Sequence, residues 1–250
     1  LIFNQTYKQT EITYGVSFSP NYARYLGLDW QKTYLAILDE LQVRNLSLTS
    51  FWDTIEKDPE KPDFSQVDFQ LSEASKRGAK VILVVGARQP RWPECHIPEW
   101  ARQLTPEERK LKTLEFVQKT VERYKDHPEI IGYQVENEPF AFWFGENCDA
   151  PDSVFLQKEI ELVKSIDPKK IMVTDSGEWG NWISAIIFSD NLGISIYRRS
   201  YNSTLGIYTV YPFPAWMYTL KSTVLSKLFG HPNQKTILAE LQTEPWVSDQ

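Results

Sequence analysis

Residues 130–139 read Ile-Ile-Gly-Tyr-Gln-Val-Glu-Asn-Glu-Pro, and this stretch decides the fold. Its apolar half predicts a buried strand. Pro139 ends that strand, because proline fixes its own backbone and has no N–H to donate. Glu138 therefore stands at the last position of the strand. Because side chains alternate along a strand, we expect Gln134, Glu136 and Glu138 on one face.

A second stretch has the same form about a hundred residues later: residues 236–240 read Thr-Ile-Leu-Ala-Glu. A single glutamate at a strand end is more often a solvated or ion-paired acid than a catalytic one. Two such acids, each at the carboxyl end of a buried strand, are what cleavage of a glycosidic bond in a barrel requires. Asn137, beside Glu138, can hydrogen-bond a sugar hydroxyl next to the reacting carbon. The sequence therefore points to Glu138 and Glu240 as a catalytic pair.

Strands and helices alternate along the rest of the chain. Apolar runs predict strands at 14–19, 46–52, 80–86, 130–138, 171–175, 192–197 and 236–240. Helical spacing predicts helices at 29–41, 64–76, 106–124, 153–166, 182–188 and 216–228, and residues 201–215 are expected to hold a small hairpin. Asp29 is the expected N-cap of the first helix, and Gly78 closes the second.

This serial repetition predicts an α/β fold, a TIM (β/α)8 barrel, with a doubly wound sheet as the alternative. The barrel is favoured because no glycine-rich phosphate loop follows the first strand. We expect residues 1–250 to form a single (β/α)8-barrel catalytic domain. Only residues 241–250 follow the seventh strand, so the predicted barrel is truncated there and its final helix–strand–helix unit is absent.

Composition narrows the class of partner. The 250 residues carry a net charge of −6 and no long basic run, which argues against a nucleic-acid partner. No apolar stretch approaches the ~18 residues of a membrane span. The chain starts at Leu1 rather than Met, which suggests an exported protein whose upstream segment has been removed. The compartment stays open, since Cys95 and Cys148 could pair or remain free thiols.

Neither a metal nor an organic cofactor is expected. The three histidines, His96, His127 and His231, are isolated from one another. Ser176 follows a strand, but no Gly-x-Ser-x-Gly elbow surrounds it. Residues 175–178 are equally suited to binding sugar hydroxyls and to forming a turn.

The two acidic stretches, residues 132–139 and 238–240, together resemble the clan A glycoside hydrolases, which include families 5, 35, 39 and 42. The resemblance covers nearly the whole chain and implies the barrel fold. It also implies retaining double displacement at a β-glycosidic bond of an oligosaccharide or glycoside. Glu138 would then be the acid/base and Glu240 the nucleophile. Glu244 is the rival nucleophile, but Glu240 ends the apolar run directly.

Two further positions are judged by the same resemblance. In several families of the clan a tyrosine at the end of strand six bonds the nucleophile, which makes Tyr197 a candidate; a buried core tyrosine is the alternative. Clan members often carry an arginine on strand two, where this chain has Ser47. Arg44 lies too low on the strand to replace it. Loss of that strand-two arginine would weaken the ionisation and positioning of Glu240 unless Arg88, Arg91 or Arg198 compensates.

Tryptophans follow the carboxyl ends of several predicted strands. Indole rings stack on the apolar faces of sugars, although each one alone is more often a packing residue. The six are Trp52, Trp92, Trp143, Trp179, Trp182 and Trp246. Trp52, Trp92 and Trp246 are the chosen substrate-binding candidates, together with Asn137 and Tyr197. The polar and aromatic loop at 91–100 also has the character of a substrate-binding loop.

The sequence thus predicts a retaining β-glycosidase. A transglycosylase differs only in the acceptor of the glycosyl group. A non-catalytic carbohydrate-binding barrel is the second hypothesis, motivated by Ser47 and the missing eighth unit. An unrelated α/β protein with coincidental strand-end acids is the third.

Overall fold

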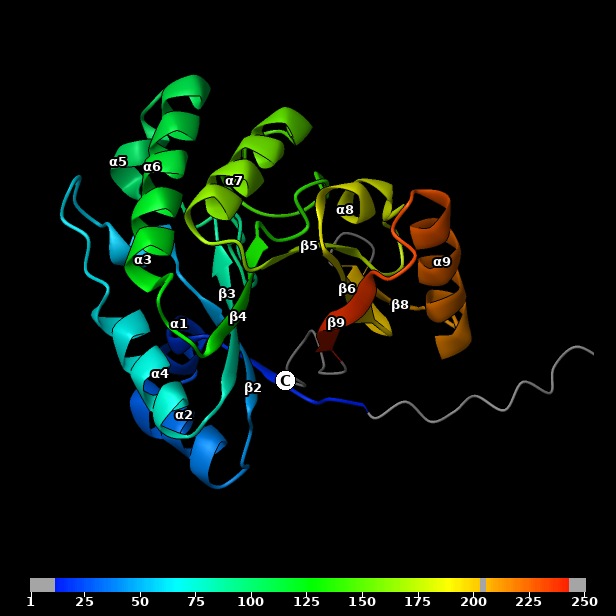
Figure 1. Cartoon of the computed structure of the whole chain (residues 1–250), viewed down its shortest axis with the longest axis horizontal. Coiled ribbons are helices and arrows are strands. Elements are labelled where there is room, and N and C mark those ends of the chain that lie inside the picture. The colour runs from blue at the N-terminus through cyan, green and yellow to red at the C-terminus, as the bar shows by residue number, and fades with distance from the viewer. Residues whose placement is uncertain (1–11, 203–205, 243–250) are drawn as a thin grey trace, which may run out of the picture.

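The computed structural model describes residues 12–202 and 206–242. Its centre is a seven-stranded sheet (Figure 1), with the order β1-β2-β3-β4-β5-β6-β9. Every neighbouring pair in this sheet is parallel. The strands are β1 (Val16–Phe18), β2 (Asn45–Thr49), β3 (Lys80–Val85), β4 (Ile130–Val135), β5 (Lys170–Ser176), β6 (Asn191–Tyr197) and β9 (Lys235–Gln242).

The strands follow one another in chain order, so the alternative of a doubly wound sheet is wrong, because that fold reverses direction at a switch point. The sheet is strongly curled, and the Ser17 hydroxyl of β1 lies 3.5 Å from the Ala239 carbonyl of β9. No strand ladder joins β1 to β9 within residues 12–202 and 206–242. The expected barrel class is confirmed, as an open, curled barrel of seven strands. That the chain forms one catalytic domain stays a prediction.

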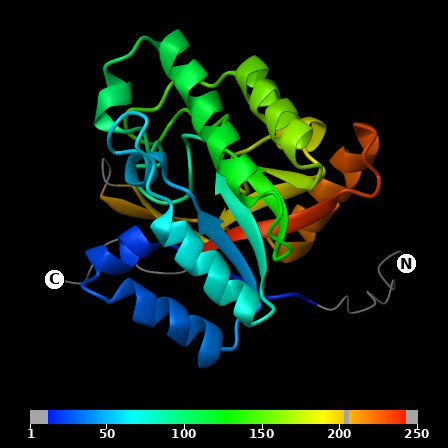
Figure 2. The same cartoon turned by 60° about the vertical axis from the view of Figure 1, so that its left-hand side comes forward.

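Helices cover the outer face of the curled sheet (Figures 1 and 2). They are α1 (Pro20–Tyr25), α2 (Trp30–Asp39), α3 (Trp52–Ile55), α4 (Ser65–Lys76), α5 (Glu99–Arg102), α6 (Pro106–Tyr124), α7 (Ser153–Ile166), α8 (Ile183–Phe188) and α9 (Ala215–Leu228). All six predicted helices are present. The Asp29 carboxylate caps α2, and Gly78 adopts a left-handed backbone after α4 (φ 64°), as expected. The other three helices are too short to show a periodic pattern.

The core lies between the sheet and these helices. Leu83 and Val85 of β3 are fully buried, as are Phe116 and Val117 of α6, and all four belong to one apolar cluster. A hairpin is present but begins two residues before the predicted range: β7 (Arg199–Asn202) pairs antiparallel with β8 (Ile207–Val210). None of the helices in the described residues is long and apolar enough to cross a membrane.

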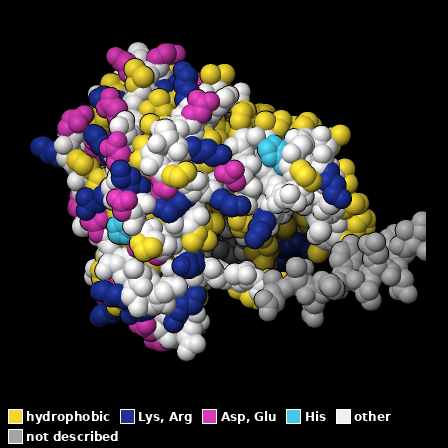
Figure 3. Space-filling view, in the orientation of Figure 1, with side chains coloured by type: hydrophobic (Ala, Val, Ile, Leu, Met, Phe, Trp, Pro, Cys, Tyr) yellow, Lys and Arg dark blue, Asp and Glu magenta, His cyan; other side chains and the backbone are white. Residues whose placement is uncertain are grey.

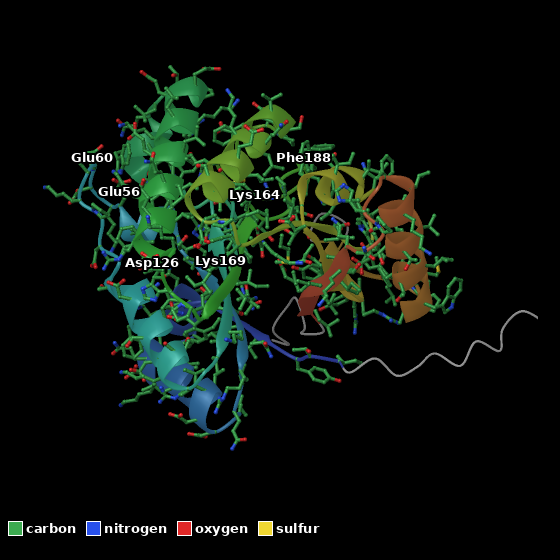
Figure 4. The ribbon with its side chains drawn as sticks, viewed as in Figure 1. Glu56, Glu60, Asp126, Lys164, Lys169 and Phe188 are labelled. Atoms are coloured by element: carbon green, nitrogen blue, oxygen red, sulfur yellow. A yellow bond between two sulfur atoms is a disulfide. The ribbon has the colours of Figure 1, made fainter. Side chains whose placement is uncertain are left out.

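Charged and apolar side chains are unevenly distributed over the surface. Figure 3 shows Lys, Arg, Asp and Glu side chains dense over the side formed by α4 and α6, and hydrophobic side chains gathered on the side of α8 and α9. On the charged side, Lys119 of α6 donates to Glu56 (3.0 Å) and Glu60 (3.1 Å). Both glutamates lie in the segment after α3, and Figure 4 labels them. These ion pairs fix that segment against α6.

Candidate active site

The chain turns sharply where β4 ends. The strand stops at Val135, and both Glu136 (φ 59°) and Glu138 (φ 41°) adopt left-handed backbone conformations. The alternation of side chains therefore breaks, and the expectation that Gln134, Glu136 and Glu138 share one face is wrong. Glu136 instead accepts hydrogen bonds from the backbone N–H groups of residues 87 (2.8 Å) and 88 (2.6 Å).

Glu138 lies inside the curled sheet, on the side of β5, β6 and β9. Its backbone N–H donates to the Thr174 hydroxyl of β5 (2.8 Å), and the residue is only 4% exposed. Burial raises the pKa of Glu138 to about 8; the Ser195 hydroxyl lowers it, while the negative charge of Glu240 raises it further. The carboxyl group is therefore protonated at neutral pH and can donate a proton.

Glu240 of β9 receives a hydrogen bond from the phenol of Tyr197, at the end of β6. Burial raises the pKa of Glu240, whereas the Tyr197 hydrogen bond, the positive charge of Arg91 and the Asn137 side chain each lower it. Burial, together with the nearby Glu240 charge, raises the pKa of Tyr197, so the phenol stays protonated as a donor. The structure thus brings Tyr197 and Glu240 together; the roles of both residues stay predictions.

Asn137 is buried between these groups, with 2% of its surface exposed. Its side-chain oxygen accepts from Gln134 Nε2 (3.1 Å) and from the Thr174 hydroxyl (3.1 Å). These two donors fix the orientation of the amide, because only its oxygen can accept. Its Nδ2 therefore points the other way and donates to Glu94 Oε2 at 3.0 Å. A sugar-binding role for Asn137 stays a prediction.

Glu94 is the residue that sequence reasoning missed. It lies in the loop after β3, is 9% exposed, and has a pKa raised to about 7, first by burial and then by the charge of Glu240. The composition of residues 91–100 indicated a binding loop but singled out no acid. A disulfide between Cys95 and Cys148, with a Cα–Cα distance of 5.3 Å, ties this loop to the segment after β4. Pairing of the cysteines, which the sequence left open, is thereby decided.

The prediction that Trp52 binds substrate is wrong. The residue is fully buried, stacks on Phe116 of α6 and donates from its indole N–H to Glu56 (2.9 Å). The reason is local: β2 ends at Thr49, three residues earlier than predicted, and Trp52 begins α3. Its ring therefore enters the layer between sheet and helices.

The other five candidate tryptophans differ in how much of their surface is exposed, where the structure describes them. Trp92, Trp143 and Trp179 expose 65%, 50% and 69% of their surface, so their rings are available to a ligand. Trp182 is fully buried and donates to the carbonyl of residue 176 (2.8 Å). Trp246 and the rival acid Glu244 lie outside the described residues.

Of the arginines considered as replacements at Ser47, Arg91 is the one whose charge lowers the pKa of Glu240. Arg44 donates to the carbonyls of residues 38 (2.8 Å) and 43 (2.9 Å), low on the strand as expected. Arg88 donates to the Asn137 carbonyl (2.8 Å). The charge of Arg198 lowers the pKa of Glu178 instead.

Comparison with known proteins supports the fold. No protein-family model matches the sequence, and no curated protein matches it. Among solved structures, the chain is similar to GH5_18 from Streptomyces cattleya in complex with GlcNAc (13% identity, TM-score 0.57). This match covers 73% of this chain and 50% of that one.

Two further matches have the same character. One is a β-galactosidase from Bacillus circulans sp. alkalophilus (14% identity, TM-score 0.56), with 86% of this chain and 42% of that one covered. The other is a family 39 glycoside hydrolase from Bacteroides cellulosilyticus WH2 (18% identity, TM-score 0.50), with 75% and 40% covered. The chain thus spans about half the length of these proteins or less. They are glycoside hydrolases, as the sequence resemblance implies, and at these identities the likeness shows the fold alone.

Proposed function

We propose that this chain carries the catalytic residues of a retaining glycoside hydrolase that cleaves β-glycosidic bonds, and that it folds as one catalytic domain. The observation that carries the proposal is a buried acid, Glu138, beside a partly buried acid, Glu240, whose neighbours act on its charge in the opposite direction. Glu138 is raised to a pKa of about 8, and Glu240 is held by a phenol donor and by the charge of Arg91. Two acids whose environments differ in this way are suited to the roles of proton donor and nucleophile.

In the first step, a carboxylate oxygen of Glu240 attacks the anomeric carbon while the bond from that carbon to the leaving oxygen breaks. The proton of Glu138 goes to the leaving oxygen. In the second step, Glu138 takes a proton from water, the water oxygen attacks the anomeric carbon, and Glu240 leaves. Tyr197 holds the nucleophile in place and stabilises its charge through the hydrogen bond. No metal or organic cofactor enters either step.

The expected substrate is an oligosaccharide or glycoside. Support comes from the exposed indole of Trp92, which directly follows Arg91, the residue whose charge acts on Glu240. The structures with the same fold are a protein bound to GlcNAc, a β-galactosidase and a family 39 glycoside hydrolase. Hydrolysis and transfer to a second sugar share the first step, so a transglycosylase is compatible with the same acids.

The test uses 4-nitrophenyl β-glycosides with the full chain, in the presence and absence of azide. Glu240→Ala should lose turnover, and azide should restore it with an α-glycosyl azide as product. Glu138→Ala should keep turnover of an aryl substrate whose leaving group is activated, and azide should then give the β-glycosyl azide. Azide replaces the missing carboxylate in the first case and the attacking water in the second, so the two configurations differ.

Glu146→Gln is the matched control, because it removes one exposed carboxylate from the segment after β4. Its turnover should equal that of the unchanged chain. A first-formed sugar product of inverted configuration, measured by proton NMR, would contradict the retaining mechanism. Unchanged turnover in Glu240→Ala would remove Glu240 from its role.

A further inference from the structure

The proposed mechanism uses two acids, yet a third buried carboxyl group, that of Glu94, lies in the same site. The charge of Glu240 raises the pKa of Glu94, and the charge of Glu94 in turn raises the pKa of Glu138 and of Tyr197. Electrostatic influence of this kind requires proximity, so Glu94 is part of the site and not of a separate surface.

Asn137 links Glu94 to the nucleophile. Its oxygen is occupied by Gln134 and Thr174, and its Nδ2 donates to Glu94 while also lowering the pKa of Glu240. The amide nitrogen therefore serves two carboxyl groups of the protein. The sugar carbon next to the reacting carbon would consequently face the oxygens of Glu94, which accept hydrogen bonds. The sequence suggested that the Asn137 amide would act there as a donor.

The position of Glu94 is fixed before any ligand binds. Its backbone N–H donates to the carbonyl of Arg91 (2.8 Å), and its own carbonyl accepts from the N–H of Gln89 (2.8 Å). The next residue, Cys95, is held by the disulfide. Glu94 itself has a left-handed backbone (φ 70°), which costs free energy for a residue with a side chain and persists only where the surroundings enforce it. A preorganised polar group of this kind is typical of a binding residue.

The charges of Arg88 and His96 lower the pKa of Glu94, but burial and the charge of Glu240 outweigh them. Arg88 directs its guanidinium to the carbonyls of Asn137 (2.8 Å) and Phe144 (3.2 Å) and to the sulfur of Cys148 (3.3 Å). Burial and the charge of Glu240 thus disfavour the negative form of Glu94 in the unliganded site. A cationic group on the ligand would both donate a charge-assisted hydrogen bond to Glu94 and stabilise its negative form.

We propose that Glu94 binds the sugar directly and selects a ring that carries a protonated amine beside the reacting carbon. The substrate class is then a β-linked amino sugar. This inference rests on the proposed function, since it assigns the specificity of the same site. The ammonium group donates to the Glu94 carboxylate alongside the hydrogen bond that Glu94 accepts from Asn137, while Glu240 faces the anomeric carbon. Glu94 takes no part in bond breaking and is a binding residue.

The test is calorimetric binding at pH 7 of methyl β-D-glucosaminide and methyl β-D-galactosaminide, each against its parent with a hydroxyl in place of the amine. We expect at least one amino sugar to bind about tenfold more tightly than its parent, because a charge-assisted hydrogen bond is roughly twice as strong as a neutral one. In Glu94→Gln the two members of the pair should bind within about twofold of each other. Glu94→Asp, which keeps the charge, should retain the preference.

Glu146→Gln is again the control and should leave the ratio of affinities unchanged. Equal affinities in the unchanged chain, or binding of neither amino sugar, overturn the inference. Equal weakening of both sugars by Glu94→Gln also overturns it, because that is the effect of a merely structural role. Binding does not require turnover, so failure of this test leaves the hydrolase proposal standing, and a sugar preference that depends on Glu94 can be measured whatever the azide test shows.

Discussion

Glu138 is buried and Glu240 is partly buried, and different neighbours act on their protonation. Other carboxyl groups surround Glu138 and add to the effect of burial, whereas a phenol and an arginine oppose burial at Glu240. The pKa of both acids is raised, but at Glu240 the phenol and the arginine oppose the rise, so the two environments differ in the direction that their proposed roles require. Single substitutions in this set should move the pH dependence of turnover in directions that can be stated in advance.

The first prediction concerns pH. Turnover measured as kcat/KM should fall as the pH rises through about 8, because Glu138 then loses the proton that it must donate. Tyr197→Phe removes a group that lowers the pKa of Glu240, so the acidic limb of the profile should shift to higher pH. Tyr25→Phe, at a residue 83% exposed, should leave both limbs in place. An acidic limb unmoved by Tyr197→Phe would contradict the role of the phenol.

A second pair of carboxyl groups, those of Glu136 and Glu159, is buried on the outer side of β4. Glu159 of α7 is fully buried and forms a side-chain hydrogen bond with Glu136. It lines a cavity of about 470 Å³ together with Glu136. Burial raises the pKa of Glu159 well above its ordinary value, and the charge of Glu136 raises it further. Glu159 is therefore protonated in the folded chain at neutral pH.

This gives a stability prediction. A carboxyl group whose pKa is higher in the folded than in the unfolded chain contributes stability that is complete below its unfolded pKa, about 4.3, and is lost as the pH rises through the folded value. Glu159→Gln cannot ionise and can donate to Glu136, so it should raise the free energy of unfolding by about 1–3 kcal/mol at pH 8, and by less at pH 5. Urea unfolding at both values measures this. Glu161→Gln, exposed on the same helix, is the control; a loss of stability in Glu159→Gln at pH 8 would contradict the assignment.

Among the elements, the segments that follow β3 and β4 determine the site. The loop after β3 supplies Arg91, Trp92 and Glu94, and the turn after β4 supplies Asn137 and Glu138. The two segments are joined by the Cys95–Cys148 disulfide and by the Asn137–Glu94 hydrogen bond. Residues on loops are precise only where such links hold them, so the disulfide acts on the site as well as on stability.

The third prediction follows from the disulfide. The bond closes a loop with a sequence separation of 53 residues. Loop-closure entropy predicts that the double change Cys95→Ser and Cys148→Ser lowers the free energy of unfolding by about 4 kcal/mol. Thermal or urea unfolding of the double variant, with and without reductant, measures the loss. Reductant should destabilise the unchanged chain and leave the double variant unaffected; equal stability of the two chains would contradict the bond.

At the scale of the whole molecule, α9 has an unusual distribution of side chains. Its buried face carries Ser222 and Ser226, while four apolar residues at intervals of four are more than half exposed: Trp216, Leu220, Val224 and Leu228. This is the hydrophobic side seen in Figure 3. An exposed apolar stripe of this kind favours association, since burying it removes apolar surface from water.

The fourth prediction is that the chain as given self-associates through this stripe. The double change Leu220→Lys and Val224→Glu should lower the mean particle mass in light scattering at high protein concentration. It should leave the unfolding midpoint within a few degrees, because both side chains are already exposed. Lys158→Glu with Glu161→Lys, on the exposed face of α7, is the matched control. Unchanged association in the α9 variant would show that the stripe stays solvated.

The sequence by itself determined the elements and the class of fold. Strand and helix periods, the Asp29 cap and the Gly78 stop are local signals, because they depend on residues a few positions apart. The two strand-end acids are also local signals. The resemblance of their segments to glycoside hydrolases implied the barrel fold that the structure has. Local signals did not decide where strands end: β2 stops at Thr49 and β4 at Val135, so Trp52 entered the core.

Only the tertiary structure decided which groups meet. Glu94 lies 43 residues before its partner Asn137 in the sequence, and Tyr197 lies 43 before Glu240. Parallel pairing of β3 with β4 and of β6 with β9 brings them together, and the path of each loop orients the side chains. The pKa values of the acids follow from burial and from neighbouring charges, which exist only once the chain is folded. A sequence can therefore place an acid at a strand end, but the fold sets its protonation and its neighbours.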